Sequence, residues 1–475
     1  MTSGWGKSNP LTTFSARYHT KRKNFLKPGQ KTISQFLDNE YRAFALYSIE
    51  SRAIASVVDG FKPVGRKIIH TASSIWKNLS VKPLKIFQLS GKVSSESFYH
   101  HGSSSLDGAI TQMAQRFKNN LPLLEEHGQF GSLRAPEASA PRYIATKLSP
   151  IFSHLYKDEE LLEYLEEEGQ KIEPKYFLPI VPTILINGGS GIAVGFSSNI
   201  LNRDPLEVVS GVIDVLSGRR AKKLSPKIVG FRGEFLSDPQ NPKRWIIRGI
   251  FKNINKISTQ ILEIPPSFTW ERYEEVLDDL QARGMISSWE DNCKEDINYT
   301  VRWDKSVMGT LSDEQMIKLL KLEEYSTEIF TTLDESGKLK VFESDIEILE
   351  YFTHFRLGFY QKRKDLLIKN LEHEILILSN RARFIKGVIE GEIRVMNVPK
   401  RDLTGRLLEL EFTKIDGGYE YLLRMPISSL VREIYEKILK DLQDKKEELE
   451  TLSQKEIKSL YLQDLQKLKK LLSEI

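Results

Sequence analysis

The chain has 475 residues, with 69 Lys and Arg against 64 Asp and Glu, and one cysteine, Cys293. Its length allows roughly three domains of about 150 residues each. The single cysteine excludes an internal disulfide and a cysteine-rich zinc module, and no apolar run is long enough to cross a bilayer. Because the sequence shows no secretory leader, we expect a cytoplasmic protein.

Positive charge is concentrated at the start of the chain. Residues 1–31 contain no acidic residue and seven basic ones, Lys7, Arg17, Lys21, Arg22, Lys23, Lys27 and Lys31. Such a basic N-terminal arm can lie along phosphates or dock on an acidic partner, and a solvated tail or an organellar transit peptide fits the same composition. Gly6-Lys7-Ser8 is no phosphate loop, because Met1 stands where such a loop requires its first glycine.

The next segments predict a helix and then a basic helix start. Residues Ile33–Leu46 have amphipathic spacing, and Val57–Lys67 reads VVDGFKPVGRK. In the second segment Asp59-Gly60 is a turn signal, and Pro63 suits the first turn of a helix. Backbone amides and cations at the start of a helix together favour the binding of a phosphate. Any one of these cations could instead simply be exposed to solvent at the helix start. The cations are Lys62, Arg66 and Lys67.

A second helix is predicted within Ser97–Phe117, which reads SFYHHGSSSLDGAITQMAQRF. Its apolar stripe indicates a core face, while its start, which includes Ser104, is typical of a helix that enters a DNA groove. With the helix that begins near Pro63, it predicts a helix-turn-helix. The adjacent His100 and His101 cannot easily bind one metal, so we expect phosphate contact, or a structural role for one of them.

The stretch His127–Ser149, HGQFGSLRAPEASAPRYIATKLS, contains Arg142-Tyr143, which we interpret as a nucleophile and its cation. A phenol has a reference pKa of about 10, so attack by Tyr143 on a DNA phosphodiester needs cationic help, first from Arg142. Further cations must stabilise the charge that builds on the phosphate oxygens. The pair alone decides nothing, because the chain has 17 tyrosines and Arg-Tyr occurs twice more.

The middle of the chain is acidic and then glycine-rich. Glu159–Glu168, EELLEYLEEE, is expected to be a solvated helix face, and Pro182–Ile200, PTILINGGSGIAVGFSSNI, an apolar strand followed by a glycine-rich turn. A dinucleotide site is rejected for this turn, because the run Asn199–Pro205 breaks the chain where a helix would have to continue. From the residues alone, Ile192 is an ordinary core residue.

The last part of the chain changes from mixed elements to long helices. Short β-like runs and helices alternate from Leu206 to about Phe342. Seven-residue repeats follow, which predict an antiparallel helical hairpin with a compact head at Glu390–Met425. The repeats are Ile368, Ile375, Ala382 and Ile389, with Leu371, Leu378 and Ile385, and in the second helix Leu442, Leu449 and Leu452. No Asp-x-Asp and no ATPase motif occurs, so a partner would have to supply the metal site and the ATPase domain.

Arg52 and five of the stretches described above occur in an order that resembles the breakage and reunion subunit of type IIA DNA topoisomerases, the family of gyrase A and topoisomerase IV. They are Arg52, VVDGFKPVGRK, YHHG, HGQFGS, PRY and ILINGGSGIAVGFSSNI. The resemblance spans nearly the whole chain. Within the family the pattern is nearest to the medium subunit of T4-like phages, because YHHG lacks the residue that gyrase carries between its histidines.

The resemblance implies roles for individual residues. Tyr143 would form a 5′-phosphotyrosyl link with Arg142 beside it, while Arg52 and His101 would flank the scissile phosphate. Ile192 would be a wedge between base pairs that bends the duplex. The other implied DNA-binding residues are Lys62, Arg66, Lys67, His100, Ser104 and Asn187. No metal ligand is implied on this chain, and Gly65 stands where the family usually has a histidine.

The resemblance also implies an α+β multidomain fold and its partners. The expected parts are the arm at 1–32, a winged-helix (helix-turn-helix) DNA-cleavage domain at 33–155, an α/β tower at 156–342, and at 343–475 a long antiparallel coiled coil with a small helical dimerisation head at about 390–428. The expected partners are double-stranded DNA, a second copy in a homodimer, and an ATPase and Toprim subunit that binds Mg²⁺ and uses ATP.

The implied function is a transient double-strand break for ATP-dependent strand passage. The lack of sequence after Ile475 for a DNA-wrapping pinwheel favours relaxation or decatenation over supercoiling. Two alternatives stay open: a non-enzymatic winged-helix and coiled-coil scaffold for DNA, and within the enzyme class a gyrase-like supercoiling enzyme.

Overall fold

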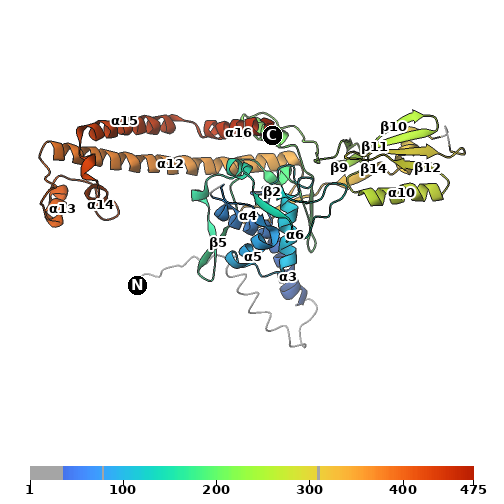
Figure 1. Ribbon diagram of the computed structural model, residues 1–475, viewed down its shortest axis with the longest axis horizontal. Coiled ribbons are helices and arrows are strands. Elements are labelled where there is room, and N and C mark those ends of the chain that lie inside the picture. Colours follow the sequence, from blue (N-terminus) through green and yellow to red (C-terminus); the bar gives the residue numbers. More distant parts are fainter. Residues whose placement is uncertain (1–35, 78–79, 308–310, 475) are drawn as a thin grey trace. The chain divides into compact units, whose positions relative to one another are not determined.

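The computed structural model describes residues 36–77, 80–307 and 311–474, so the basic N-terminal arm lies outside the described residues. The fold mixes helices and strands, as predicted (Figure 1). The chain forms two compact units, one of described residues up to His354 and from Leu465 on, and one of residues 355–464. No described helix is both long and apolar enough to cross a membrane.

The first part of the chain packs three helices with a small antiparallel sheet of order β1-β3-β2. Helix α4 begins at Pro63, whose fixed φ suits a first turn, and it buries Ile68, Ile69 and Ala72. Helix α6 buries Leu106, Ile110 and Ala114 at a spacing of four. The elements are η1 (Leu37–Tyr41), α3 (Arg42–Ser48), η2 (Ile49–Ala53), α4 (Pro63–Ile75), β1 (Leu84–Lys85), α5 (Ile86–Glu96), α6 (Ser103–Ala114), β2 (Leu124–His127), β3 (Ala145–Leu148) and α7 (Ile151–Leu155).

The prediction that Glu159–Glu168 forms a solvated helix face is wrong. The segment forms a short 3₁₀ turn, η3 (Glu159–Leu161), and then strand β4 (Tyr164–Glu167), which pairs with β5 (Gln170–Pro174). The turn between the strands is Glu168-Gly169, whose φ values are 50° and 78°. Two positive φ values in a two-residue turn match the twist of a hairpin, so the turn geometry overrides the helical propensity of the glutamates.

The expected strand and glycine-rich turn at Pro182–Ile200 are also corrected. The apolar run is a one-turn helix, α8 (Thr183–Ile186), with all four residues buried. Periodicity cannot separate a buried strand from a buried helix in so short a run. Of the glycines that follow, Gly189 and Gly191 lie in strand β6 (Gly189–Ile192), which forms a hairpin with β7 (Ser197–Ile200), while Gly195 lies in the turn between the two strands. Helix α9 (Pro205–Leu216) comes next.

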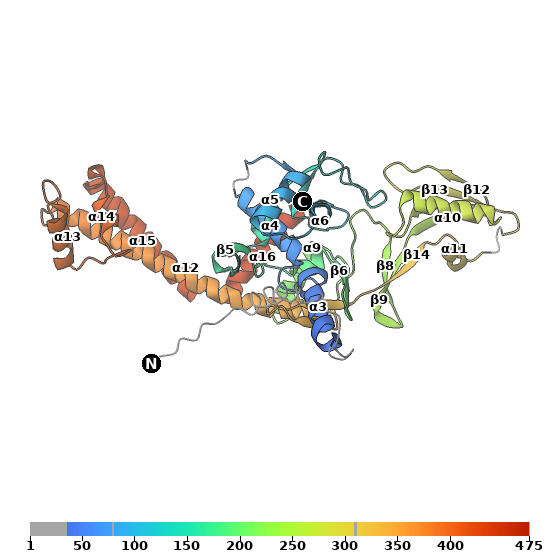
Figure 2. The same ribbon diagram turned by 90° about the horizontal axis from the view of Figure 1, so that it is seen from below.

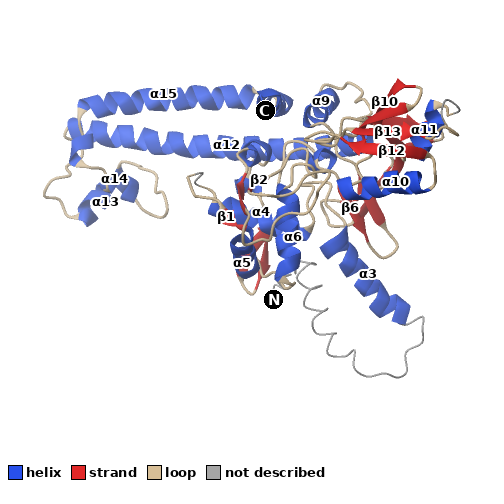
Figure 3. Cartoon of the chain, turned by 45° about the vertical axis from the view of Figure 1, so that its right-hand side comes forward, coloured by secondary structure: helices blue, strands red, loops and turns tan. Residues whose placement is uncertain are grey.

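Strands dominate residues 234–342. A four-stranded antiparallel sheet, β10-β11-β13-β12, is covered by α10 (Figure 3). The core between them includes Tyr273, Leu277 and Tyr299. A three-stranded sheet, β14-β9-β8, and the hairpin β15-β16 complete the region. The elements are β8 (Glu234–Asp238), β9 (Asn241–Arg248), β10 (Ile250–Asn255), β11 (Ser258–Glu263), α10 (Trp270–Ala282), β12 (Ile286–Asp291), β13 (Tyr299–Trp303), α11 (Asp313–Leu319), β14 (Glu323–Thr327), β15 (Phe330–Leu333) and β16 (Leu339–Phe342).

Long helices form most of the second unit. Helix α12 lies beside α15 in opposite direction, since Lys364 binds the Ser453 carbonyl and Glu374 binds Lys445 (Figures 1 and 2). The residues of the predicted repeat of α12 are buried or partly buried, except Ile389, which is 47% exposed. A separate core around Leu407 and Tyr419 fills residues 390–425. The helices are α12 (Asp345–Ile389), α13 (Lys400–Glu409), α14 (Glu420–Leu423), η4 (Ile427–Ser429), α15 (Arg432–Gln454) and α16 (Ile457–Glu474).

Candidate active site

Tyr143 lies on a turn whose backbone is fixed by two hydrogen bonds. Its amide donates to the Ala140 carbonyl at 2.8 Å, and its carbonyl accepts from Lys85 Nζ at 2.8 Å. The next residue, Ile144, is buried and leads into β3. The side chain of Tyr143 is nevertheless 65% exposed, and the Arg142 guanidinium carbon lies 5.1 Å from the centroid of its ring. The turn therefore presents a phenol with a cation beside it.

Arg52 and His101 form a second pair. Arg52 lies at the end of η2, and its Nη2 is 3.3 Å from His101 Nδ1 and 3.5 Å from Nε2, so the guanidinium donates to the imidazole. Partial burial, then Arg52 and then His100, lower the pKa of His101 below its ordinary value. A neutral imidazole beside a guanidinium is thus favoured at neutral pH. The contact joins residues 49 positions apart.

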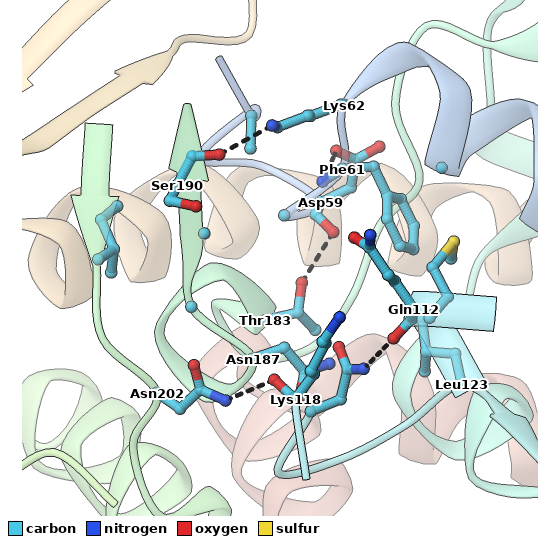
Figure 4. Close-up of a pocket in the computed structure, with 18 of the residues that line it drawn as sticks. Asp59, Phe61, Lys62, Gln112, Lys118, Leu123, Thr183, Asn187, Ser190 and Asn202 are labelled. Atoms are coloured by element: carbon cyan, nitrogen blue, oxygen red, sulfur yellow. Dashed lines mark hydrogen bonds between the residues drawn. The ribbon is translucent and has the colours of Figure 1, made fainter. Parts of the chain in front are cut away.

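The hairpin β6-β7 presents an apolar side chain to solvent. Ile192, at the end of β6, is 89% exposed, so it is not the ordinary core residue that the residues alone suggest. Lys62, just before α4, donates from Nζ to the Ser190 carbonyl at 2.8 Å (Figure 4). Burial lowers the pKa of Lys62. A half-buried cation from the segment before α4 thus binds the strand that ends in the exposed isoleucine.

Arg66 and Lys67, two of the expected DNA contacts, instead have side chains that point inward. Arg66 is 9% exposed, and its Nε and Nη2 bind the fully buried carboxylate of Asp59 at 2.8 and 3.2 Å. Lys67 Nζ binds the Ser97 carbonyl and Glu173 Oε2, the latter at 2.9 Å. These cations neutralise buried carboxylates, which a sequence pattern of cations alone does not reveal.

The side-chain amide of Asn187, a third expected DNA contact, also binds within the protein. Its Oδ1 accepts from the Leu121 amide at 2.8 Å, and its Nδ2 donates to the Leu121 carbonyl at 2.9 Å. Both the oxygen and the nitrogen of this side-chain amide therefore form hydrogen bonds within the protein. His100 is exposed and pairs with Glu167 on β4 at 3.1 Å, while Ser104 is exposed in the first turn of α6.

A cavity of about 450 Å³ lies between α6, the start of α4 and the hairpin β6-β7 (Figure 4). Lys62 and Lys118 line it together with the polar side chains of Gln112 and Asn202. Burial lowers the pKa of Lys118 as well. Two partly desolvated cations favour anions at this place, beside the later part of α6, which lines the cavity with Ala109, Gln112 and Met113.

Some residues that shape the site were not predicted. Lys85 holds the Tyr143 carbonyl, and Asp59 accepts from the Phe61 and Phe177 amides as well as from Arg66. Asp59 was predicted only as part of a turn. Across the described ranges, no group of three or more His, Cys, Asp or Glu side chains could hold a metal ion.

Comparison with known proteins agrees with the predicted resemblance. The profile of the family formed by the A subunits of DNA gyrase and topoisomerase IV matches residues 52–469. The DNA topoisomerase medium subunit of Enterobacteria phage T4 is 34% identical over 448 residues, which cover 92% of this chain and 99% of that protein. The mitochondrial DNA topoisomerase 2 of Dictyostelium discoideum is 33% identical over 464 residues, which cover 93% of this chain and 35% of that enzyme.

A solved structure is similar over most of the chain. The DNA-binding, cleavage and re-ligation domain of Plasmodium falciparum topoisomerase II aligns with a TM-score of 0.81 and 32% identity, over 92% of this chain and 64% of that one. The chain thus spans about a third of the Dictyostelium enzyme and nearly all of the phage subunit. These matches confirm the predicted resemblance: the chain belongs to the gyrase A and topoisomerase IV family.

Proposed function

We propose that the chain is the DNA-binding and cleavage subunit of an ATP-dependent type IIA DNA topoisomerase, with Tyr143 as its nucleophile. One observation carries the proposal: in a chain of this family, the Tyr143 phenol is 65% exposed on an anchored turn, with the Arg142 guanidinium 5.1 Å from its ring. Most exposed aromatic side chains need no explanation, but an exposed phenol fixed beside a cation suits attack on a phosphate.

The reaction is a transesterification. The Tyr143 oxygen forms a bond to phosphorus, the bond from phosphorus to the 3′ oxygen breaks, and that oxygen takes up a proton to leave a 3′ hydroxyl. The 5′ end stays on the tyrosine as a phosphodiester, so the number of ester bonds is unchanged. The reverse attack by the 3′ hydroxyl therefore reseals the strand without consuming ATP in the chemistry.

Arg52 and His101 are proposed to flank the scissile phosphate. Charge builds on the non-bridging oxygens during attack, and a guanidinium held in place is well suited to stabilise it. The 3.3 Å contact between Arg52 Nη2 and His101 Nδ1 supports this role, because it orients the guanidinium. The lowered pKa of His101 favours a neutral imidazole, which can act as a proton acceptor.

The wider fold is proposed to serve DNA passage. Residues 33–155, with α4, α6 and the sheet β1-β3-β2, would be a winged-helix domain, and the start of α6 with Ser104 would face the DNA together with His100. Residues 156–342 would be the tower. Residues 343–475 would form the coiled coil, whose head at about 390–428 would join two copies into a homodimer.

Ile192 is proposed to be the wedge that bends the duplex. An isoleucine that is 89% exposed at a hairpin end is poorly placed for packing within the chain, and insertion between base pairs would desolvate it. Lys62, one of the cations that line the cavity, is proposed to contact the DNA backbone nearby.

Mg²⁺ and ATP are proposed to belong to a partner subunit. The described residues offer no cluster of ligands that fits Mg²⁺, which prefers several oxygen ligands. The sequence contains no ATPase motif either. We therefore assign both to an ATPase and Toprim subunit that assembles with this chain.

The experiment traps the covalent intermediate. The chain, co-expressed with the subunit that co-purifies with it, is mixed with 5′- or 3′-labelled duplex and Mg²⁺, and denaturant is added. Protein should become linked to DNA 5′ ends, and Tyr143→Phe should abolish the link. Tyr325→Phe is the matched control, because Tyr325 is 57% exposed and has Arg244 5.3 Å from its ring. An adduct that survives Tyr143→Phe, or no adduct with wild type, contradicts the proposal.

Relaxation is proposed as the activity rather than supercoiling. Negatively supercoiled plasmid should be relaxed in the presence of ATP, and linked rings should be separated. Introduction of supercoils into relaxed plasmid would instead favour the gyrase-like alternative. Binding of DNA without any trapped adduct would favour the scaffold.

A further inference from the structure

The hairpin that carries Ile192 touches the backbone of the segment that carries Arg52. A Cβ atom added at Gly191 would lie 1.9 Å from the Ala53 carbonyl oxygen and 2.9 Å from the Ala53 carbonyl carbon. No side chain fits at such distances, and the obstacle is backbone, which cannot rotate away. Gly191 is the neighbour of Ile192, and Ala53 is the neighbour of Arg52. One close backbone contact therefore connects the two.

Two further contacts fasten this strand. Lys62 Nζ donates to the Ser190 carbonyl at 2.8 Å, and it lies 3.5 Å from the position of a Cβ at Gly191 (Figure 4). On the other side of Ile192, Ala193 packs against the small core formed by Ile49, Ala53, Ile54 and Leu333. The strand is thus held both before and after the exposed isoleucine.

The second strand of the hairpin is held as well. The Asn199 amide donates to the Ile329 carbonyl at 3.0 Å, and the Ile329 amide donates back at 2.9 Å. Nearby, the Leu333 amide donates to the Ala55 carbonyl at 2.9 Å. The segment after Arg52 and the hairpin therefore share a set of backbone contacts, and a displacement of the hairpin reaches the Arg52 segment through them.

We propose that Gly191 and Lys62 are positioning residues, which couple insertion of Ile192 into the duplex to the placement of Arg52 at the scissile phosphate. The inference rests on the proposed function and adds to it a physical link between bending and cleavage. A force on Ile192 is transmitted through Gly191 to the Ala53 carbonyl, one peptide from Arg52. Lys62 keeps the strand in place while this happens.

Substitution of Gly191 tests the link, with Gly189 as the matched control. Both glycines lie in β6 with ordinary φ, but a Cβ at Gly189 meets only the end of the Ile184 side chain, at 3.1 Å. DNA bending is measured by energy transfer between dyes at the two ends of a duplex, and cleavage by the trapped adduct at saturating DNA, both with the co-purified complex. Gly191→Ala should keep bending while cleavage falls about ten- to hundredfold, the effect of misplacing a catalytic group by about 1 Å.

A double-mutant cycle shows whether Gly191 acts through Arg52. In an Arg52→Lys background, Gly191→Ala should cause no further loss of cleavage, because the group that it positions is already altered. Losses that multiply would mean independent roles, and this outcome overturns the link. A general folding defect would also multiply with Arg52→Lys, so the cycle separates positioning from damage to the fold.

A second variant covers the case in which Gly191→Ala does not fold. Lys62→Met removes the bond to Ser190 without a steric clash, and it should lower the maximal cleavage rate at saturating DNA in addition to affinity. A loss of affinity alone overturns the positioning role of Lys62. Wild type and Gly189→Ala should both form adduct that depends on Tyr143. If Gly191→Ala forms as much adduct as they do, the proposed link is wrong, while the proposed function stands. No adduct with wild type contradicts the proposed function itself.

Discussion

The inward orientation of Arg66 makes a prediction that separates a structural cation from a DNA contact. Arg66→Met keeps most of the aliphatic length and removes the charge. Because the guanidinium is buried against Asp59, we expect a loss of folding stability and little change in the salt dependence of DNA binding. If Arg66 instead bound a phosphate, the slope of log K against log salt would fall by about 1 while stability stayed the same.

The expected loss follows from what remains around Asp59. Breaking a buried ion pair by removing one partner costs about 3–5 kcal/mol, because the other charge stays buried without compensation. The Phe61 and Phe177 amides still donate to the Asp59 carboxylate, each at 3.1 Å, so we expect a value near the lower limit, about 3 kcal/mol. With about 2–4 °C per kcal/mol for a large domain, the Tm should fall by roughly 6–12 °C.

Calorimetry of the full chain measures the first quantity, and DNA binding at several salt concentrations measures the second. Arg283→Met is the control, because Arg283 is more than half exposed and pairs with Asp279 on the surface of α10. An exposed pair contributes at most about 1 kcal/mol, so this variant should melt close to wild type. An Arg66→Met protein that melts like the control and loses salt dependence would refute the argument.

Three other features give predictions of the same kind. Gly60 and Gly169 both have positive φ, but only at Gly60 would an added Cβ meet Thr183 and Ile184, at 2.6 and 2.9 Å. In urea unfolding, Gly60→Ala should therefore destabilise the protein by about 1–3 kcal/mol more than Gly169→Ala, which is the typical cost of overpacking. Leu371 is 7% exposed and Leu376, on the same helix, is 37% exposed. Leu371→Ala should therefore lower the free energy of unfolding of the second unit by about 2–4 kcal/mol, and Leu376→Ala should lower it by less than about 1 kcal/mol. His101 should titrate below 6.5 in an NMR pH series, because burial and Arg52 disfavour its charged form.

Each of these has a clear contrary result. Equal losses at Gly60 and Gly169 would mean that the Gly60 turn is not packed against α8. Equal losses at Leu371 and Leu376 would place the helix seam elsewhere. For His101, a pKa above 6.5 would contradict the contact with Arg52. A lowered native pKa also means that the unfolded chain takes up the proton first, so acidification through pH 6.5 should reduce stability.

The parts of the fold that follow local rules were predictable. Pro63 after a turn signal marks the start of α4, and the heptad spacing from Ile368 to Ile385 marks the buried face of α12. Both rest on geometry within one element. The exposed turn of Tyr143 was also singled out, but through motif order and not through any property of Arg-Tyr itself.

What could not be predicted depends on contacts between distant segments. A pattern of three cations after Asp59 does not show that Arg66 and Lys67 turn inward, because their partners include Glu173, more than 100 positions away. Gly191 is one of several glycines in its run, and only the approach of Ala53, far away in sequence, explains it. The Glu168-Gly169 turn was missed because its first residue is not a typical one for positive φ.

The nucleophile itself can be observed directly. Adduct formed by the wild-type complex on a labelled duplex is digested with nuclease and trypsin, and mass spectrometry locates the residual nucleotide on the chain. The account predicts a 5′-linked nucleotide on the peptide that begins at Tyr143 and ends at Lys147. A nucleotide on any other tyrosine, or a link through the 3′ end, would contradict it.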